Sequence, residues 1–342
     1  MASIDLASLG WDDDFALAFA PYAETHEPGR VARVDRGAVT ALTASGPCRA
    51  AIDPDLSPTV GDWVALADEP PCVDVVLPRR TAIARGSATG TSTLHVLAAN
   101  VDTVFVALPL TKSKLGLVER LVTLVWESGA TPVVLLTKAD LSPDPSAVIT
   151  ETTAAAPGVD VHPVSAITGD GLEELSAYVG FGRTIAVVGQ SGVGKSTLVN
   201  RLVGAEVLST GAIREDGKGR HTTTHRELVP LPTGGMLIDT PGLRGVALVD
   251  AEDGLAQTFA DVEDLTDNCY FSDCAHASEP GCAVLAAVSG GSLAQRRYDS
   301  WCKLRREAAW MASRTDARLA AEQRRKWKAI SKSQRAGYRL RP

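Results

Sequence analysis

An apolar run that leads into a glycine-rich loop constrains the fold of this chain more than any other feature. Residues 185–188 are Ile-Ala-Val-Val, residues 189–196 are Gly-Gln-Ser-Gly-Val-Gly-Lys-Ser, and residues 197–202 are typical of a helix. The glycines allow consecutive backbone N–H groups to surround phosphate groups, which the Lys195 amine would also reach, and the Ser196 hydroxyl can bind Mg²⁺. A strand, a phosphate-binding loop and a helix in this order predict an α/β nucleotide-binding fold. The residues of this segment predicted to contact nucleotide are Gly189, Gln190, Ser191, Gly192, Val193, Gly194, Lys195, Ser196 and Thr197.

Two further apolar runs indicate that the loop belongs to a parallel sheet. Residues 104–108 and 133–136 are continuously apolar, as expected for strands that helices cover on both faces. Residues 115–126 between them suit a crossover helix. We therefore expect an α/β nucleotide-binding domain over residues 89–248.

A base-recognition signature precedes the phosphate-binding loop instead of following it. The signature is Thr137-Lys138-Ala139-Asp140, directly after a predicted strand. The Asp140 carboxylate can accept hydrogen bonds from guanine N1–H and the exocyclic amine together, a donor pair that adenine lacks. Lys138 would flank the base, and a backbone N–H near Ser165 and Ala166 would serve guanine O6. The alternative is a capping aspartate beside a surface lysine. Ordinary GTPases carry these motifs in the reverse order, so the sequence predicts a circularly permuted GTPase domain.

Thr137 occupies the position that is usually Asn in GTPases. Its hydroxyl can replace part of the hydrogen bonding that ties this loop to the phosphate-binding loop, but it has fewer donors than an amide. We expect modest nucleotide affinity as a result.

The predicted magnesium site combines Ser196 with Asp239. Asp239 directly follows the apolar run 236–238 and begins the sequence Asp-Thr-Pro-Gly. An aspartate at the end of that strand would hold Mg²⁺ through water, and the Gly242 amide would sense the γ-phosphate. Asp239 lies 43 residues after Ser196, where this partner of the metal is expected.

The segment between these two motifs offers a candidate for positioning the attacking water. Many GTPases place a Gln directly after Asp-x-x-Gly, but this chain has Leu243 there. Residues 219–225 contain His221, which can orient or polarise water, and Thr223, which can place a hydroxyl on Mg²⁺. The alternative is that His221 is a polar surface residue.

A second metal site is predicted near the C-terminus. Cys269, Cys274, His276 and Cys282 lie within fourteen residues. Three thiolates and one imidazole suit tetrahedral Zn²⁺ in a closed, structural site, because no ligand position remains for a catalytic water. The alternative is a set of unrelated buried cysteines. We expect one Zn²⁺ per chain.

The remaining organisation of the chain is predicted from strand and helix patterns. Residues 1–28 mix acidic and aromatic side chains and predict a short amphipathic helix and linker. Residues 29–88 contain short β-rich runs separated by turns, which favour a small barrel. Residues 249–342 contain the zinc cluster and a helix from Ser292 to about Lys328, with a basic tail.

The charge distribution is strongly asymmetric. The net charge is −7, yet from Arg296 to the end the chain has 15 Lys/Arg and only 4 Asp/Glu. This tail suits contact with a polyanion, although a solvated helical surface is the alternative interpretation. No apolar run approaches the roughly 18 residues needed to span a bilayer. We expect a cytoplasmic protein without membrane contact, and a monomer by default.

With these motifs in place, the chain resembles the circularly permuted bacterial GTPases known as the RsgA or YjeQ family. The resemblance rests on the motif order, the phosphate-binding loop, Gly219-Arg220-His221-Thr222-Thr223-Thr224, Asp239-Thr240-Pro241-Gly242 and the zinc-ligand spacing. It covers nearly all of the chain. Thr137 and the acidic N-terminal segment depart from the family pattern.

The resemblance implies an N-terminal OB-fold that contacts ribosomal RNA, a permuted GTPase domain with Mg²⁺ and GTP or GDP, and a C-terminal zinc domain. It also implies a role late in the maturation of the 30S ribosomal subunit, binding to 16S rRNA, and GTP hydrolysis that the 30S subunit stimulates. The catalytic histidine of the family maps onto His221. Its zinc ligands map onto the four residues of the C-terminal cluster.

Two other functions compete with a ribosome-stimulated GTPase on the residues alone. One is an RNA-binding module that uses nucleotide only as a conformational switch. The other is a small-molecule kinase built on the same phosphate-binding loop, for which the guanine signature would have no task.

Overall fold

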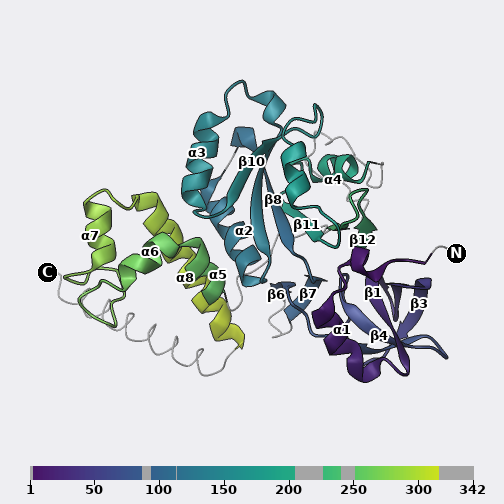
Figure 1. Cartoon of the computed structure of the whole chain (residues 1–342). Helices are drawn as coiled ribbons and strands as arrows, with labels where there is room; N and C mark the ends of the chain where they lie inside the picture. The colour runs from purple at the N-terminus through teal and green to yellow at the C-terminus, as the bar shows by residue number, and fades with distance from the viewer. Residues whose placement is uncertain (1–2, 87–93, 113, 205–225, 240–250, 316–342) are drawn as a thin grey trace.

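A computed structural model describes residues 3–86, 94–112, 114–204, 226–239 and 251–315. Figure 1 shows three parts: a barrel near the N-terminus, a sheet flanked by helices, and a group of C-terminal helices. Across these described ranges, no helix has the length and apolar character required to cross a membrane.

The central sheet has the order β10-β9-β8-β11-β13-β12. Its first five strands run parallel, and β12 pairs antiparallel with β13. The chain therefore enters the sheet on β8, next to the strand of the phosphate-binding loop, β11. The bounds are β8 (Thr103–Pro109), β9 (Thr131–Thr137), β10 (Asp160–Val164), β11 (Thr184–Gly189), β12 (Glu227–Pro230) and β13 (Met236–Asp239).

Helices cover both faces of the sheet, which explains why its strands are apolar throughout. Val104, Val106 and Leu108 of β8 pack in one cluster with α2 (Leu115–Glu127) and α3 (Ser146–Ala155). Phe105 and Ala107 point to the opposite cluster, which includes α4 (Lys195–Val203) and the 3₁₀ helix η5 (Glu173–Ala177). Alternate residues of one strand thus belong to two cores, and the prediction of a doubly covered sheet is confirmed.

The N-terminal barrel has five strands in the order β1-β2-β3-β5-β4, closed by a second pairing between β1 and β4. The β3–β5 pair is parallel and the other pairs are antiparallel. This is the predicted OB-type barrel. The bounds are β1 (His26–Asp35), β2 (Ala38–Thr43), β3 (Gly46–Ile52), β4 (Trp63–Ala67) and β5 (Cys72–Val76).

The N-terminal segment packs on the barrel. It forms the 3₁₀ helices η1 (Leu6–Leu9) and η2 (Ala20–Tyr22) around α1 (Asp13–Phe19). Trp11 lies 4.7 Å, centroid to centroid, from the buried ring of Trp63, and Phe15 lies 5.8 Å from it. The aromatic residues of the predicted amphipathic helix are therefore part of a core.

A buried arginine joins three separate stretches of chain at this place. Arg30 of β1 is 1% exposed and donates hydrogen bonds to the carbonyl oxygens of Leu9, Gly61 and Asn100. Burial lowers the pKa of Arg30 to about 10, which still leaves it charged at neutral pH. Asn100 follows the hairpin of β6 (Ala82–Gly86) and β7 (Leu94–Ala99), so Arg30 links the N-terminal segment and barrel to the entry of the central sheet.

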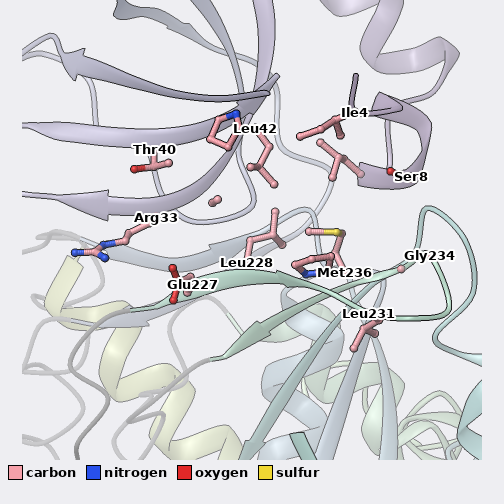
Figure 2. A pocket seen from close by; sticks show the side chains of 15 residues that line it. Ile4, Ser8, Arg33, Thr40, Leu42, Glu227, Leu228, Leu231, Gly234 and Met236 are labelled. Carbon is pink, nitrogen blue, oxygen red and sulfur yellow. The ribbon is translucent and has the colours of Figure 1, made fainter. Parts of the chain in front are cut away.

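The barrel and the central sheet also meet through their strands. Arg33 of β1 pairs with Glu227 of β12, which makes the two sheets continuous. Beside this pair, Figure 2 shows a mainly apolar groove between the barrel and the β12–β13 hairpin, with Leu42 on one side and Leu228 and Met236 on the other. The groove has a volume of about 560 Å³.

The C-terminal part consists of α5 (Glu252–Thr258), α6 (Ala260–Thr266), α7 (Ala283–Ser289) and α8 (Gln295–Thr315). Trp301, Leu304, Ala308 and Met311, which are spaced three or four residues apart along α8, are buried. Helix α8 begins three residues later than expected, and residues 316–342, with most of the predicted basic tail, lie outside the described residues. Figure 1 shows this part beside α2 of the central domain.

Candidate nucleotide-binding site and metal centre

The predicted nucleotide-binding residues gather at one edge of the central sheet. Strands β9, β10, β11 and β13 are parallel, so their carboxyl ends meet at the same edge. This places residues 137–140, 165–166, 189–196 and Asp239 around one site. Ligands of open α/β sheets bind at this edge.

The phosphate-binding loop needs glycine where it leaves β11 and where it enters α4. Gly189 has φ 148°, and a Cβ on it would lie 2.3 Å from the carbonyl oxygen of Ala107. Gly194 has φ 100° and is the N-cap residue of α4. Ser191 and Gly192 are exposed, whereas Val193 is buried beneath them. The loop is therefore held against the sheet at its base and open at its tip, and it leads directly into the start of a helix.

Lys195 lies across this loop. Its Nζ donates hydrogen bonds to the carbonyl oxygens of Gly189 at 2.9 Å and Gln190 at 2.8 Å. The amine is thus held where the phosphates of a nucleotide would lie.

Thr137 and Lys138 tie the base-recognition segment to the phosphate-binding loop. The Thr137 hydroxyl donates to the carbonyl oxygen of Val193 at 2.7 Å, with the carbonyl oxygen of Leu108 as a second acceptor at 3.1 Å. Lys138 Nζ donates to the carbonyl oxygen of Gly192 at 2.8 Å. Thr137 is 5% exposed, so its hydroxyl needs such a partner. Threonine thereby makes the cross-loop contact that we expected in part.

The carboxylate of Asp140 has a defined orientation. The hydroxyl of Ser165 donates to Asp140 Oδ1 at 2.6 Å and also accepts a hydrogen bond from the backbone N–H of Thr168 at 3.2 Å. Ser165 is completely buried and Asp140 is exposed, so the carboxylate points its remaining acceptor sites outward from a fixed base. Ala166 follows Ser165 at the end of β10 and is half-buried. A role for Ser165 in holding Asp140 was not foreseen from the sequence.

Asp239 ends β13 in register with Val187 of β11. Burial raises the pKa of its carboxyl, and the positive charge of Lys195 acts in the opposite direction. Ser196 lies in the first turn of α4, next to the phosphate-binding loop, and is half-buried. Both side chains carry oxygen atoms of the kind that Mg²⁺ prefers as ligands. The other residues predicted here, His221, Thr223 and Gly242, lie outside the described residues.

The four predicted zinc ligands converge. The Sγ atoms of Cys269 and Cys282 are 3.9 Å apart, and His276 Nδ1 lies 3.5 Å from the first and 3.7 Å from the second. With Cys274 Sγ, all four ligand atoms lie within 4.8 Å of one another. A tetrahedral Zn²⁺ with Zn–S bonds of about 2.3 Å requires sulfur atoms roughly 3.8 Å apart. The cluster therefore fits a structural zinc site.

Neighbouring groups hold the ligand loop in shape. Glu279 accepts hydrogen bonds from the backbone N–H groups of residues 275, 277 and 278, which lower its pKa to about 2. The Tyr298 hydroxyl donates to the carbonyl oxygen of His276 at 2.6 Å. Burial lowers the pKa of His276, which favours the neutral imidazole that a metal requires.

A buried ionic cluster joins the zinc-cluster part to the central domain, and the sequence did not reveal it. Glu119 of α2 is completely buried and accepts hydrogen bonds from Arg296, Arg297 and Ser300 of α8. Arg297 is 3% exposed and also binds Asp261 at 2.7 Å. The sequence offered one signal: Glu119 lies among the apolar positions of a helix, and a buried carboxylate needs a partner.

The parallel sheet, the phosphate-binding loop on β11 and the base-recognition segment on the earlier β9 define a circularly permuted P-loop GTPase. The model of a family described as RsgA GTPase matches residues 76–249. The chain belongs to the RsgA family.

Its relatives and structural neighbours agree with this assignment. The Small ribosomal subunit biogenesis GTPase RsgA of Streptomyces coelicolor is 51% identical over 337 residues, which cover 94% of this chain and 92% of the relative. The RsgA of Methanosarcina acetivorans is 38% identical and covers 94% and 90%. The crystal structure of YjeQ from Thermotoga maritima superimposes with a TM-score of 0.61 at 26% identity, covering 82% of this chain and 97% of that one.

YloQ, described as a circularly permuted GTPase, has a TM-score of 0.58 at 24% identity and covers 81% of this chain and 93% of its own. It supports the fold alone.

Proposed function

We propose that this chain hydrolyses GTP as an assembly factor of the small ribosomal subunit, and that the 30S subunit stimulates its hydrolysis. The observation that carries the GTPase assignment is the pair of contacts from Thr137 and Lys138 to the phosphate-binding loop. They support a site in which Asp140 selects guanine beside the phosphate-binding loop, despite the reversed motif order. Membership of the RsgA family supports the ribosomal role.

The residues at the carboxyl edge would divide the work of hydrolysis. Backbone N–H groups of residues 189–196 and the Lys195 amine would hold the phosphates, and Asp140 would select guanine. Mg²⁺, held by Ser196, Asp239 and Thr223, would neutralise charge on the β- and γ-phosphates. We assign water positioning to His221 and sensing of the γ-phosphate to Gly242. Hydrolysis would leave GDP as the bound product.

The finer points are part of the same proposal. The zinc cluster holds one structural Zn²⁺, and the chain acts as a cytoplasmic monomer that contacts 16S rRNA. The basic residues that follow Arg297, which together with Arg296 binds Glu119, and the OB-type barrel are the candidate RNA-contacting regions.

A single assay series tests base choice, catalysis and partner. GTP and ATP turnover are measured with and without purified 30S subunits, for the unmodified chain and for His221→Ala. We expect GTP turnover to rise several-fold with 30S subunits and His221→Ala to lose the stimulated rate. Equal turnover with and without 30S subunits would contradict the ribosomal role, and transfer of phosphate to an acceptor other than water would contradict hydrolysis.

A further inference from the structure

The zinc-ligand loop presents a pair of aromatic side chains to solvent. Tyr270 is 79% exposed and Phe271 is 41% exposed, and their ring centroids lie 4.8 Å apart with an interplanar angle of 85°. They directly follow the ligand Cys269. Two adjacent exposed aromatic rings are unusual on a surface that contacts only water.

The backbone fixes the position of this pair. The Tyr270 N–H donates to the carbonyl oxygen of Gly281 at 3.1 Å, next to the ligand Cys282. Gly281 has φ 76°, and a Cβ on it would lie 2.8 Å from Tyr270 Cβ. The aromatic pair is therefore carried by the metal loop itself. A partner would meet a preformed surface, with little ordering cost.

The stretch of chain that carries the pair is acidic. Residues 251–295 contain eight Asp/Glu and no Lys or Arg. Asp264, Asp267 and Asp273 are exposed near the pair in sequence, and none of them forms a salt bridge with another described residue. Arg297 and Arg305 of α8 face this part of the chain. Arg297 is buried against Glu119 and Asp261, whereas Arg305 is exposed and stacks over the Trp301 ring at 4.4 Å, so of the two a single exposed arginine stands against these carboxylates.

We propose that Tyr270 and Phe271, with the exposed carboxylates of the same stretch of chain, form a docking surface for a Lys/Arg-rich segment of a small-subunit protein. This inference rests on the proposed function, because it places the partner on the 30S subunit. A particle built on RNA offers two surfaces: phosphates, and the basic protein segments that neutralise them. Carboxylates repel the first and attract the second, and guanidinium or ammonium groups bind favourably over aromatic rings.

Site-specific crosslinking identifies what this surface touches. Tyr270→benzoylphenylalanine and Phe271→benzoylphenylalanine are each bound to purified 30S subunits with a non-hydrolysable GTP analogue, irradiated and analysed by mass spectrometry after nuclease digestion. We expect adducts with Lys/Arg-rich peptides. Phe181→benzoylphenylalanine, at a 61% exposed ring of the GTPase domain, is the matched control and should not give the same peptides. Adducts with rRNA, or none from a chain that cosediments with the subunit, overturn the inference.

Charge reversal tests whether the partner of this surface is positively or negatively charged. Asp264→Lys with Asp267→Lys should weaken 30S binding about fivefold or more, whereas an RNA-facing surface would bind more tightly after the same change. Tyr270→Ser with Phe271→Ser should weaken binding with unchanged zinc content and basal GTP turnover. Tighter binding of the reversed variant would overturn the inference.

The proposed function can fail separately. If the unmodified chain does not cosediment with 30S subunits, the ribosomal role is wrong, and the surface is tested with an oligoarginine peptide. Its affinity for the full chain should then fall in Tyr270→Ser with Phe271→Ser, but not in Phe181→Ser. An equal affinity in all three proteins would overturn the docking surface itself.

Discussion

The carboxylate of Glu119 lies 3.0 Å from Nη1 of Arg297, although the two residues are 178 positions apart in the chain. One belongs to the crossover helix α2 and the other to the long helix α8. Both are almost completely buried, and Arg297 also donates to the carbonyl oxygens of Ala155 and Thr258. This contact attaches the zinc-cluster part to α2, the helix that leads into β9 and the base-recognition segment.

We expect Glu119→Ala to loosen the attachment of α8. The change leaves Arg297 buried with only part of its charge compensated, which costs about 3 kcal/mol. Amide hydrogen exchange should rise in α2 and α8 and stay unchanged in the barrel. The half-buried pair Arg120–Glu307 provides the matched control, since Glu307→Ala should cost less than about 1 kcal/mol. Equal effects of the two changes would contradict a special role for the buried cluster.

Thr137→Val should weaken nucleotide binding. Valine has the same shape but cannot donate to Val193, which leaves a buried carbonyl oxygen without this partner and loosens the link between the two nucleotide loops. The expected loss is about 1 kcal/mol, or roughly fivefold in the Kd for a fluorescent GDP analogue. Thr137→Ser keeps the hydroxyl and should bind like the unmodified chain. An unchanged affinity in Thr137→Val would mean that Lys138 alone holds the loops together.

Asp140→Asn should exchange guanine specificity for xanthine specificity. An amide can donate to the xanthine oxygen that replaces the exocyclic amine of guanine, whereas a carboxylate can only accept. GTP affinity should fall by at least tenfold while xanthosine triphosphate affinity rises, in competition against the fluorescent GDP analogue. Ser165→Ala, which removes the donor that orients the carboxylate, should weaken GTP binding without creating the new specificity. Improved binding of ATP by Asp140→Asn would contradict the assignment of this residue.

Removal of zinc should unfold one part of the molecule selectively. The cluster joins the loop before α7 to a core that includes Phe259, Val284 and Trp301, so chelation should raise hydrogen exchange across α7 and the first half of α8. GDP binding, which depends on the central sheet, should change little. Cys274→Ser should therefore impair 30S-stimulated turnover more than nucleotide binding. A metal content near one Zn²⁺ per chain, lost in Cys274→Ser, is the direct check.

The sequence predicted the elements whose chemistry is local. The phosphate-binding loop, its flanking strand and the zinc ligands could be found because glycine, lysine and cysteine spacing restricts a few consecutive residues. Strand β3 could not be located in this way, since residues 46–52 lack a clear alternation of apolar and polar side chains.

Contacts between distant residues were beyond such reasoning. Nothing near Ser165 indicates that its hydroxyl holds Asp140, and nothing near Arg297 names Glu119 as its partner. Both contacts depend on tertiary packing. The presence of Thr137 in place of the usual Asn could be interpreted in advance only as a loss of hydrogen-bond donors. In the structure, the Thr137 hydroxyl still reaches the phosphate-binding loop.

The position of β11 between β8 and β13 has a mechanical consequence. The chain enters the GTPase sheet from the barrel on β8 and leaves it on β13, with the strand of the phosphate-binding loop between them. A load applied between the barrel and the C-terminal helices would thus act along these parallel strands in opposite directions. Their evenly spaced backbone hydrogen bonds would share that shear and yield together. The strand that carries the nucleotide loop would therefore lie in the path of that force.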